Sequence, residues 1–336
     1  MAHVYLFAAA FFPINGQNIV FGLYLLGIGV AVLTGLIMRH TLFKGETTPF
    51  IMELPTYHLP TLQGIFIRTG DRLKSFILNA GRVIVPMVLI LNFLNALGTD
   101  GSFGRENTNQ SVLSHIGRSL TFVFEPMGIR EDNWVATVGI FTGVLAKEAV
   151  VGTLDALYGQ LDMPLEVVEK PPFDLEESLK QAALTIPQNL SDVTNRLLDP
   201  LGLNIGALND EQTSASKQNV NTATFKAMQH SFDGQAGAFA YLLFILLYSP
   251  CVAATAAIYR ETSAAWATFT AIWTTSLAYF TATLFYQIAT FDAHPENTLL
   301  WVLTIGGIFL LVILILWQKG RHEAQMARFS LMFDNI

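Results

Sequence analysis

Six long apolar stretches constrain what this chain can fold into more than any other feature. They cover approximately residues 18–42, 75–97, 134–158, 236–258, 264–291 and 298–317. A stretch of this length with few charges can cross a lipid bilayer as a helix. Apolar residues make up 52% of the chain and charged residues 13%, whereas roughly 25% of a soluble domain is charged. The sequence therefore predicts an all-α, polytopic transmembrane helical bundle.

Composition and missing motifs narrow the function further. The net charge of −7 leaves no basic surface for nucleic acid, so we expect no nucleic-acid partner. The single cysteine, Cys251, excludes an intrachain disulfide framework. The chain contains neither the phosphate-binding G-x-x-x-x-G-K-[ST] pattern nor the G-x-S-x-G pattern of hydrolases. We therefore expect a protein that is not an enzyme and has no GTP site of its own.

Charge divides the chain into four regions. Residues 160–235 contain eleven acidic and five basic residues, which marks an acidic extramembrane insert. A first membrane region of residues 1–159 precedes it, and a second of residues 236–317 with three spans follows. Residues 318–336 form a basic tail. Residues 60–74 are amphipathic and lead into the second apolar stretch.

The distribution of basic residues predicts the orientation. Loops that remain in the cytoplasm carry an excess of Lys and Arg. The segment after the first stretch and the C-terminal tail are basic, whereas the loop 292–297 has no Lys or Arg. We therefore expect the C-terminus in the cytoplasm and the acidic insert in the periplasm. The number of membrane crossings agrees with both locations only if residues 98–235 begin and end on the same side of the membrane. The element at about 111–158 is therefore predicted to be re-entrant or broken.

The first candidate site is the pair Lys147 and Glu148, in the middle of the apolar stretch 134–158. An ionisable residue inside a membrane costs roughly 2.5–3.5 kcal/mol and usually marks a pathway or a buried pair. The alternative is that the tip of a hairpin lies at the membrane surface and both side chains reach water.

The second candidate site is the run Tyr248, Ser249, Pro250 and Cys251 in the stretch 236–258. Proline removes one helical hydrogen bond and frees a carbonyl, and interrupted helices of this kind form ion sites in transporters. A thiolate prefers transition metals to magnesium or calcium. The alternative is a buried cysteine beside an ordinary proline kink.

The third candidate is Glu53 with His58, on the predicted cytoplasmic side. A carboxylate and an imidazole five residues apart could bind a metal. On chemistry alone we prefer a role in anchoring the loop.

These motifs, taken together, resemble ferrous iron transport protein B, FeoB. The resemblance is carried by IMELP with the following YH (residues 51–58), by EDNWVATVGIFTGVLAKEAVVGTLDALY (131–158), and by LLYSPCVAATAAI (246–258). It implies a nucleoside-transporter-like gate fold with broken helices, and it covers the C-terminal part of the membrane domain. The GTP-binding domain and the first gate motif have no counterpart in the sequence.

The resemblance implies Fe²⁺ transport across the bacterial inner membrane. Cys251, Glu148 and Ser249 would then lie on the Fe²⁺ pathway, with Fe²⁺ as the transported substrate. Lys147, Pro250, Tyr248, Glu53 and His58 would serve gating or structure. The implied partners are the N-terminal GTP-binding part of FeoB, FeoA, FeoC and a second copy of the chain. Two alternatives stay open: a half-transporter scaffold that needs a partner chain, and a carrier of another divalent cation.

Overall fold

The computed structural model describes residues 2–13, 15–43, 61–145, 147, 149–161 and 222–333, with isolated helical residues between 176 and 187. Apart from two isolated β-bridges, the regular elements of these ranges are all helical, which confirms the all-α class. The elements are α1 Ala2–Phe11, α2 Gly16–Thr41, α3 Leu62–Ala96, α4 Val112–Phe124, the short η1 Glu125–Met127, α5 Trp134–Leu145, α6 Ala149–Leu161, α9 Thr222–Ser231, α10 Gly234–Leu247, α11 Val252–Glu261, α12 Ala264–Ala289 and α13 Pro295–Phe333.

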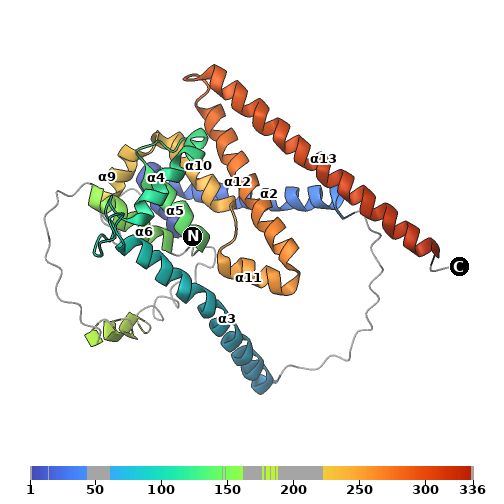
Figure 1. The fold of residues 1–336 in the computed structure, drawn as a ribbon, viewed down its shortest axis with the longest axis horizontal. Helices are drawn as coiled ribbons and strands as arrows, with labels where there is room; N and C mark the ends of the chain where they lie inside the picture. The colour runs from blue at the N-terminus through green and yellow to red at the C-terminus, as the bar shows by residue number, and fades with distance from the viewer. Residues whose placement is uncertain are drawn as a thin grey trace.

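The core lies among α1, α5, α6, α9 and α10, which gather on one side of the molecule in Figure 1. Phe7 of α1 packs against the rings of Phe232 and Tyr241, with ring centroids 5.3 and 4.9 Å apart. Phe225 and Met228 of α9 are fully buried in the same cluster. Residues 222–235, which we assigned to the acidic insert, thus pack into the helical core.

Helices α5 and α6 form a hairpin, in which α6 packs back along α5 and ends near the start of α5. An added Cβ on Gly143 would lie 2.7 Å from Val150, and one on Gly139 would lie 2.7 Å from Leu154. The Tyr158 hydroxyl donates a hydrogen bond to the side chain of Asn133, which precedes α5. Both open ends of the hairpin therefore lie together, as a re-entrant element requires.

Helix α10 runs beside α5 and stops before the chain continues into α11. Its Tyr241 hydroxyl donates to the Ala136 carbonyl at 3.0 Å, and the Tyr248 hydroxyl lies over Gly143. The two helices therefore point the same way, and neither continues into the next: α5 ends at Leu145 and α6 begins at Ala149, whereas α10 ends at Leu247 and α11 begins at Val252. The predicted broken helices are present at both places.

Side-chain contacts define two ends of the bundle. At the first, Gln287 donates to the Pro126 carbonyl at 2.8 Å and the Tyr286 hydroxyl donates to Asp233 at 2.7 Å. At the second, the ring of Phe43 stacks on Trp266 with centroids 5.3 Å apart. We call the first the acidic end, for Glu125, Asp132, Asp233, Asp292 and Glu296, and the second the basic end, for Arg39, Arg260, Lys319 and Arg321.

The long helices connect these two ends. Helices α2, α13 and the pair α10–α11 run from the acidic to the basic end, and α12 runs back. Figure 1 shows α12 and α13 diverging from their connecting turn, and both figures show the N-terminal half of α3 extending away from the bundle. Helix α13 continues to Phe333, so the predicted tail from residue 318 begins as a helix.

Three described helical segments are long and apolar enough to cross a membrane: Gly16–Thr41, Gly234–Glu261 and Pro295–His322. Shorter apolar helices are Ile84–Ala96 and Trp134–Leu145. Leu25, Ile28 and Val32 of α2 are more than half exposed, as are Leu300 and Leu303 of α13. Apolar side chains that face outward in this way are suited to lipid.

Candidate functional site

The interruption after α10 follows from its sequence. Pro250 has no backbone N–H and disfavours helical geometry at the residue before it. Tyr248 is extended, with ψ 179°, and Cys251 is extended, with φ −58° and ψ 160°. The Thr255 N–H donates to the Cys251 carbonyl at 2.9 Å, which starts α11. The chain is therefore extended at Tyr248 and at Cys251, on either side of Pro250, between α10 and α11.

Lys147 joins the two interruptions. Its Nζ donates to the Ile245 carbonyl in the last turn of α10 at 3.5 Å. It also lies 4.7 Å from the centroid of the Tyr248 ring. The last carbonyls of a helix lack helical partners and carry the negative end of the helix dipole. An ammonium from the first break thus occupies the site that the second break opens.

Tyr248 is held between the two helices. It is 3% exposed, and its hydroxyl lies against Gly143 of α5. Among the described residues the hydroxyl has no hydrogen-bond partner. Tyr248 also forms part of the wall of an apolar cavity of about 430 Å³ between α4, α5, α10 and α12. This packing fixes the orientation of the Tyr248 ring, whose face lies against the Lys147 ammonium.

Ser249, Pro250 and Cys251 supply oxygen and sulfur at the same break. The hydroxyls of Ser249 and Thr255 both donate to the Pro250 carbonyl at 3.2 Å. Ser249 is buried, and the Cys251 thiol is free and partly exposed. The break therefore combines a soft sulfur ligand with hydroxyl and carbonyl oxygens.

The other predicted site residues are not placed. Glu148, Glu53 and His58 lie outside the described residues. Within the described part of the chain, no group of three His, Cys, Asp or Glu residues could hold a metal ion.

Two features of the site were missed from the sequence. Gly143 provides the room for Tyr248, and the Ile245 carbonyl is the acceptor for Lys147. The glycine was visible as one of several in an apolar stretch. The carbonyl acceptor could not be found, because it depends on two segments 98 residues apart.

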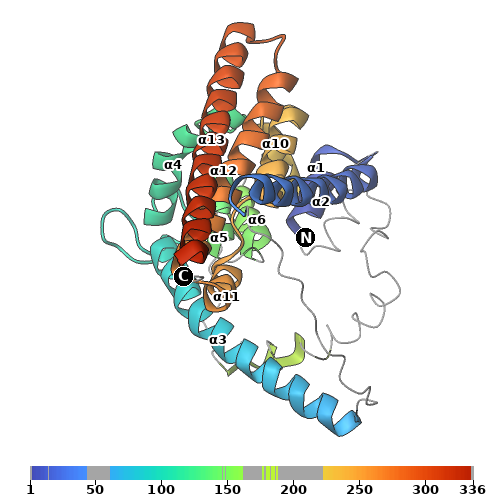
Figure 2. The same cartoon turned by 90° about the vertical axis from the view of Figure 1, so that its right-hand side faces the viewer.

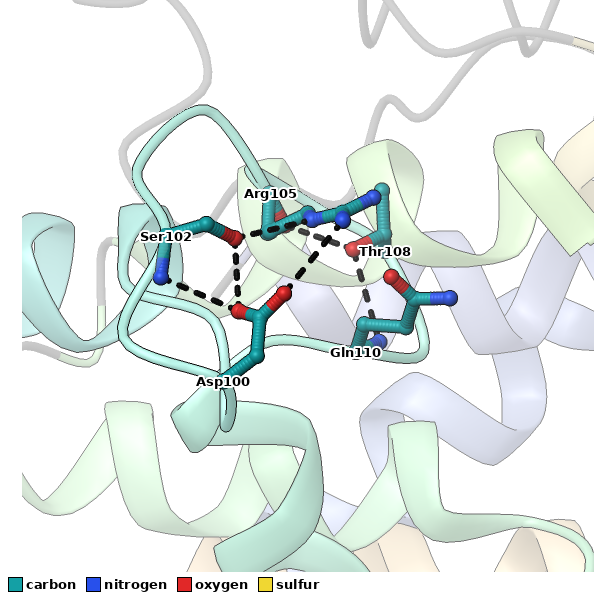
Figure 3. A network of polar contacts seen from close by, with 5 residues as sticks. All are labelled: Asp100, Ser102, Arg105, Thr108 and Gln110. Carbon is teal, nitrogen blue, oxygen red and sulfur yellow. Dashed lines mark hydrogen bonds and ion pairs between the residues drawn. The ribbon is translucent and has the colours of Figure 1, made fainter.

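A polar network orders the loop between α3 and α4 (Figure 3). Asp100 accepts from the Ser102 hydroxyl at 2.6 Å and from its backbone N–H at 3.0 Å, and it pairs with Arg105 at 3.5 Å. Hydrogen bonds from the Ser102 hydroxyl and then from its amide hold the pKa of Asp100 below its ordinary value. Thr108 accepts from the Gln110 amide at 3.4 Å.

A helical membrane protein in which two interrupted helices meet inside the bundle has the architecture of a membrane transport gate. The profile of the family described as "Nucleoside recognition", the gate family, matches residues 77–265. The profile described as "Ferrous iron transport protein B C terminus" matches residues 20–72. The chain belongs to the gate family, and its similarity is to the membrane part of FeoB, which confirms the resemblance seen in the sequence.

Curated relatives agree with these profiles. The chain is 42% identical over 324 residues to the Fe(2+) transporter FeoB of Legionella pneumophila (strain Lens), which covers 95% of this chain and 42% of that protein. It is 41% identical over 320 residues to the Fe(2+) transporter FeoB of Salmonella typhimurium (strain LT2), covering 95% and 40%. The chain therefore spans about two fifths of the length of the relatives it matches. No solved structure matches it.

Proposed function

We propose that this chain forms part of an Fe²⁺ route across the bacterial inner membrane, as the C-terminal membrane portion of a FeoB-type transporter. The observation that carries the proposal is the meeting of the two helix breaks, where Lys147 reaches the Ile245 carbonyl beside the run that ends in Cys251. Fe²⁺ is a borderline metal that accepts both sulfur and oxygen ligands. The names of the relatives support the same substrate.

In this proposal Fe²⁺ loses part of its water shell at the break after α10. The Cys251 sulfur, the Ser249 hydroxyl and the carbonyls of the last turn of α10 replace that water, and Glu148 supplies a carboxylate. The ion enters from the acidic end, which is periplasmic, and leaves toward the basic end and the C-terminus, which are cytoplasmic. Residues 1–159 and 236–317 form the two gate regions.

The proposal assigns energy coupling to partners. The N-terminal GTP-binding part of FeoB would drive the gate, with FeoA, FeoC or a second copy as further partners. The chain itself is proposed to bind no GTP. Glu53 and His58 would anchor the cytoplasmic approach to α3.

Anaerobic uptake of radiolabelled Fe²⁺ into proteoliposomes tests this function. We expect uptake when the chain is combined with a GTP-binding partner chain. Uptake should be lost in Cys251→Ala and partly kept in Cys251→Ser, because serine retains an oxygen ligand. Alanine removes only a small buried volume, worth about 1 kcal/mol, so thermal unfolding of the two variants should be similar.

The outcomes separate the candidate functions. Uptake by Cys251→Ala equal to that of the parent would show that the thiol is not a required ligand. Equal uptake of Mn²⁺ or Zn²⁺ in competition would favour a carrier of another divalent cation. A chain that binds its partner while neither variant nor parent moves metal would be a scaffold.

A further inference from the structure

Lys147 occupies a position that an incoming cation would need. Its ammonium lies 3.5 Å from the Ile245 carbonyl oxygen, in the last turn of α10. That turn ends at Leu247. The Tyr248 N–H still donates to the Phe244 carbonyl at 2.9 Å, but Pro250 has no N–H to offer the Leu246 carbonyl one turn earlier. The carbonyl end of α10 is therefore the most negative part of the backbone at this break.

The contacts of Lys147 with the break are positioned for exchange. A hydrogen bond of 3.5 Å is at the upper limit of useful length. The second contact, 4.7 Å from the centre of the Tyr248 ring, lies within the roughly 6 Å over which a ring face attracts a cation. At the same carbonyl a divalent ion is attracted more strongly than a single ammonium, because the attraction grows with the charge of the ion.

Tyr248 keeps this arrangement in register. Its ring is buried and its hydroxyl lies against Gly143, so the face presented to Lys147 is fixed by the packing of α5 on α10. Lys147 itself lies two residues beyond the end of α5. The contact between α5 and α10 thus fixes the positions of both the Lys147 ammonium and the Ile245 carbonyl that it contacts.

We propose that Lys147 is a tethered competitor for the transported divalent cation: its ammonium occupies the carbonyl end of α10 in the resting state, and the metal must displace it. Two positive charges a few ångströms apart repel strongly in a site of low dielectric constant. Lys147 therefore lowers the affinity of the break for metal and keeps it closed to monovalent ions that cannot displace it. The inference rests on the proposed function, because it requires metal at this break.

The single cysteine offers a direct assay. Cys251 is free and partly exposed, so its alkylation by N-ethylmaleimide can be followed by mass spectrometry on the full chain. Fe²⁺ added anaerobically should protect the thiol. Lys147→Gln should lower the Fe²⁺ concentration for half-protection by about tenfold, since loss of one charged contact changes an equilibrium by that order. Lys147→Arg keeps the charge and should protect like the parent.

Three further variants control the measurement. Tyr248→Leu removes the ring face and should shift half-protection in the same direction as Lys147→Gln, whereas Tyr248→Phe retains the ring and should not. Arg118→Gln removes another cation that lies over a ring, 5.4 Å from the centroid of Trp134, and should leave protection unchanged. Tyr248→Leu keeps the test decisive if Lys147→Gln does not fold.

The outcomes are distinct. Equal half-protection in the parent, Lys147→Gln and Tyr248→Leu would overturn the inference while leaving metal at Cys251 in place. Absence of protection by Fe²⁺ in every variant would overturn the proposed function itself, and the inference with it. A loss of thermal stability in Lys147→Gln without a shift in protection would make Lys147 a structural clamp.

Discussion

At the scale of single residues, the approach of α5 to α10 depends on Gly143. An added Cβ would overlap the Tyr248 hydroxyl and lie 2.7 Å from Val150. Gly143→Ala should therefore destabilise the protein by about 1–3 kcal/mol, the usual cost of overpacking a core. Thermal unfolding in detergent measures this cost. Gly152→Ala on α6 is the matched control: nothing lies within 4 Å of its added Cβ, and it should gain up to about 1 kcal/mol. Equal effects of the two substitutions would contradict the packing.

Asp100 gives the loop between α3 and α4 a dependence on pH. Its pKa is lowered in the folded protein from the ordinary value of 3.8, mainly by the Ser102 hydroxyl. Its stabilising effect is therefore fully present above that value and is lost as the pH falls through the lower folded pKa. We expect the Ser102 amide, which donates to Asp100, to lose hydrogen-exchange protection as the pH falls below the ordinary value of 3.8. In Asp100→Asn this amide should show no such step.

At the scale of elements, the sequence predicted each break better than it predicted their meeting. Pro250 is a local signal for the second break, and the loop charges required a re-entrant or broken element within residues 111–158; α10 ends at Leu247 and α5 at Leu145, as these two predictions need. The contact between Lys147 and the Ile245 carbonyl is tertiary and leaves no local pattern. Burial of α9 was missed for a related reason: its neighbours in sequence are acidic, while Phe225 and Met228 find their partners in α1 and α6.

Helix α12 is less apolar than a typical span, yet it suits a membrane. The threonines at 270, 274, 275, 281 and 290 return their hydroxyl hydrogen bonds to carbonyls four residues earlier. Polar groups that are satisfied within their own helix need no water. With 26 residues the helix is about 39 Å long, enough to join the two ends.

The break after α10 should depend on Pro250. Alanine in a helix interior is favoured over proline by about 3 kcal/mol, so Pro250→Ala should extend α10 toward α11. We expect slower alkylation of Cys251 and at least about tenfold less Fe²⁺ uptake. Pro86→Ala, inside the continuous helix α3, is the control and should leave alkylation of Cys251 unchanged. Alkylation of Pro250→Ala at the rate of the parent would mean that tertiary contacts hold the break without proline.

At the scale of the whole molecule, packing gathers the connections between helices at two ends, and the side of the membrane that each end faces stays a prediction from charge. Four connections lie together at the acidic end: those that follow α1, η1, α9 and α12. At the basic end, the connection between α11 and α12 lies beside the end of α2. Loop charges alone could predict this polarity, because it is a sum over many residues. They could not show that residues 134–158 form a hairpin, which depends on α6 packing back along α5.

That hairpin can be tested by labelling from one side of the membrane. Single cysteines in a Cys251→Ser background would replace Asp132, before α5, and the exposed His230, after α6. If the α5–α6 hairpin enters and leaves at the periplasmic side, both should react with an impermeant maleimide added outside. Thr262→Cys, at the basic end, should react only after the membrane is permeabilised. Reaction of Asp132→Cys and His230→Cys from opposite sides would mean that the segment crosses the membrane, and the orientation inferred from charge would then fail for every later span.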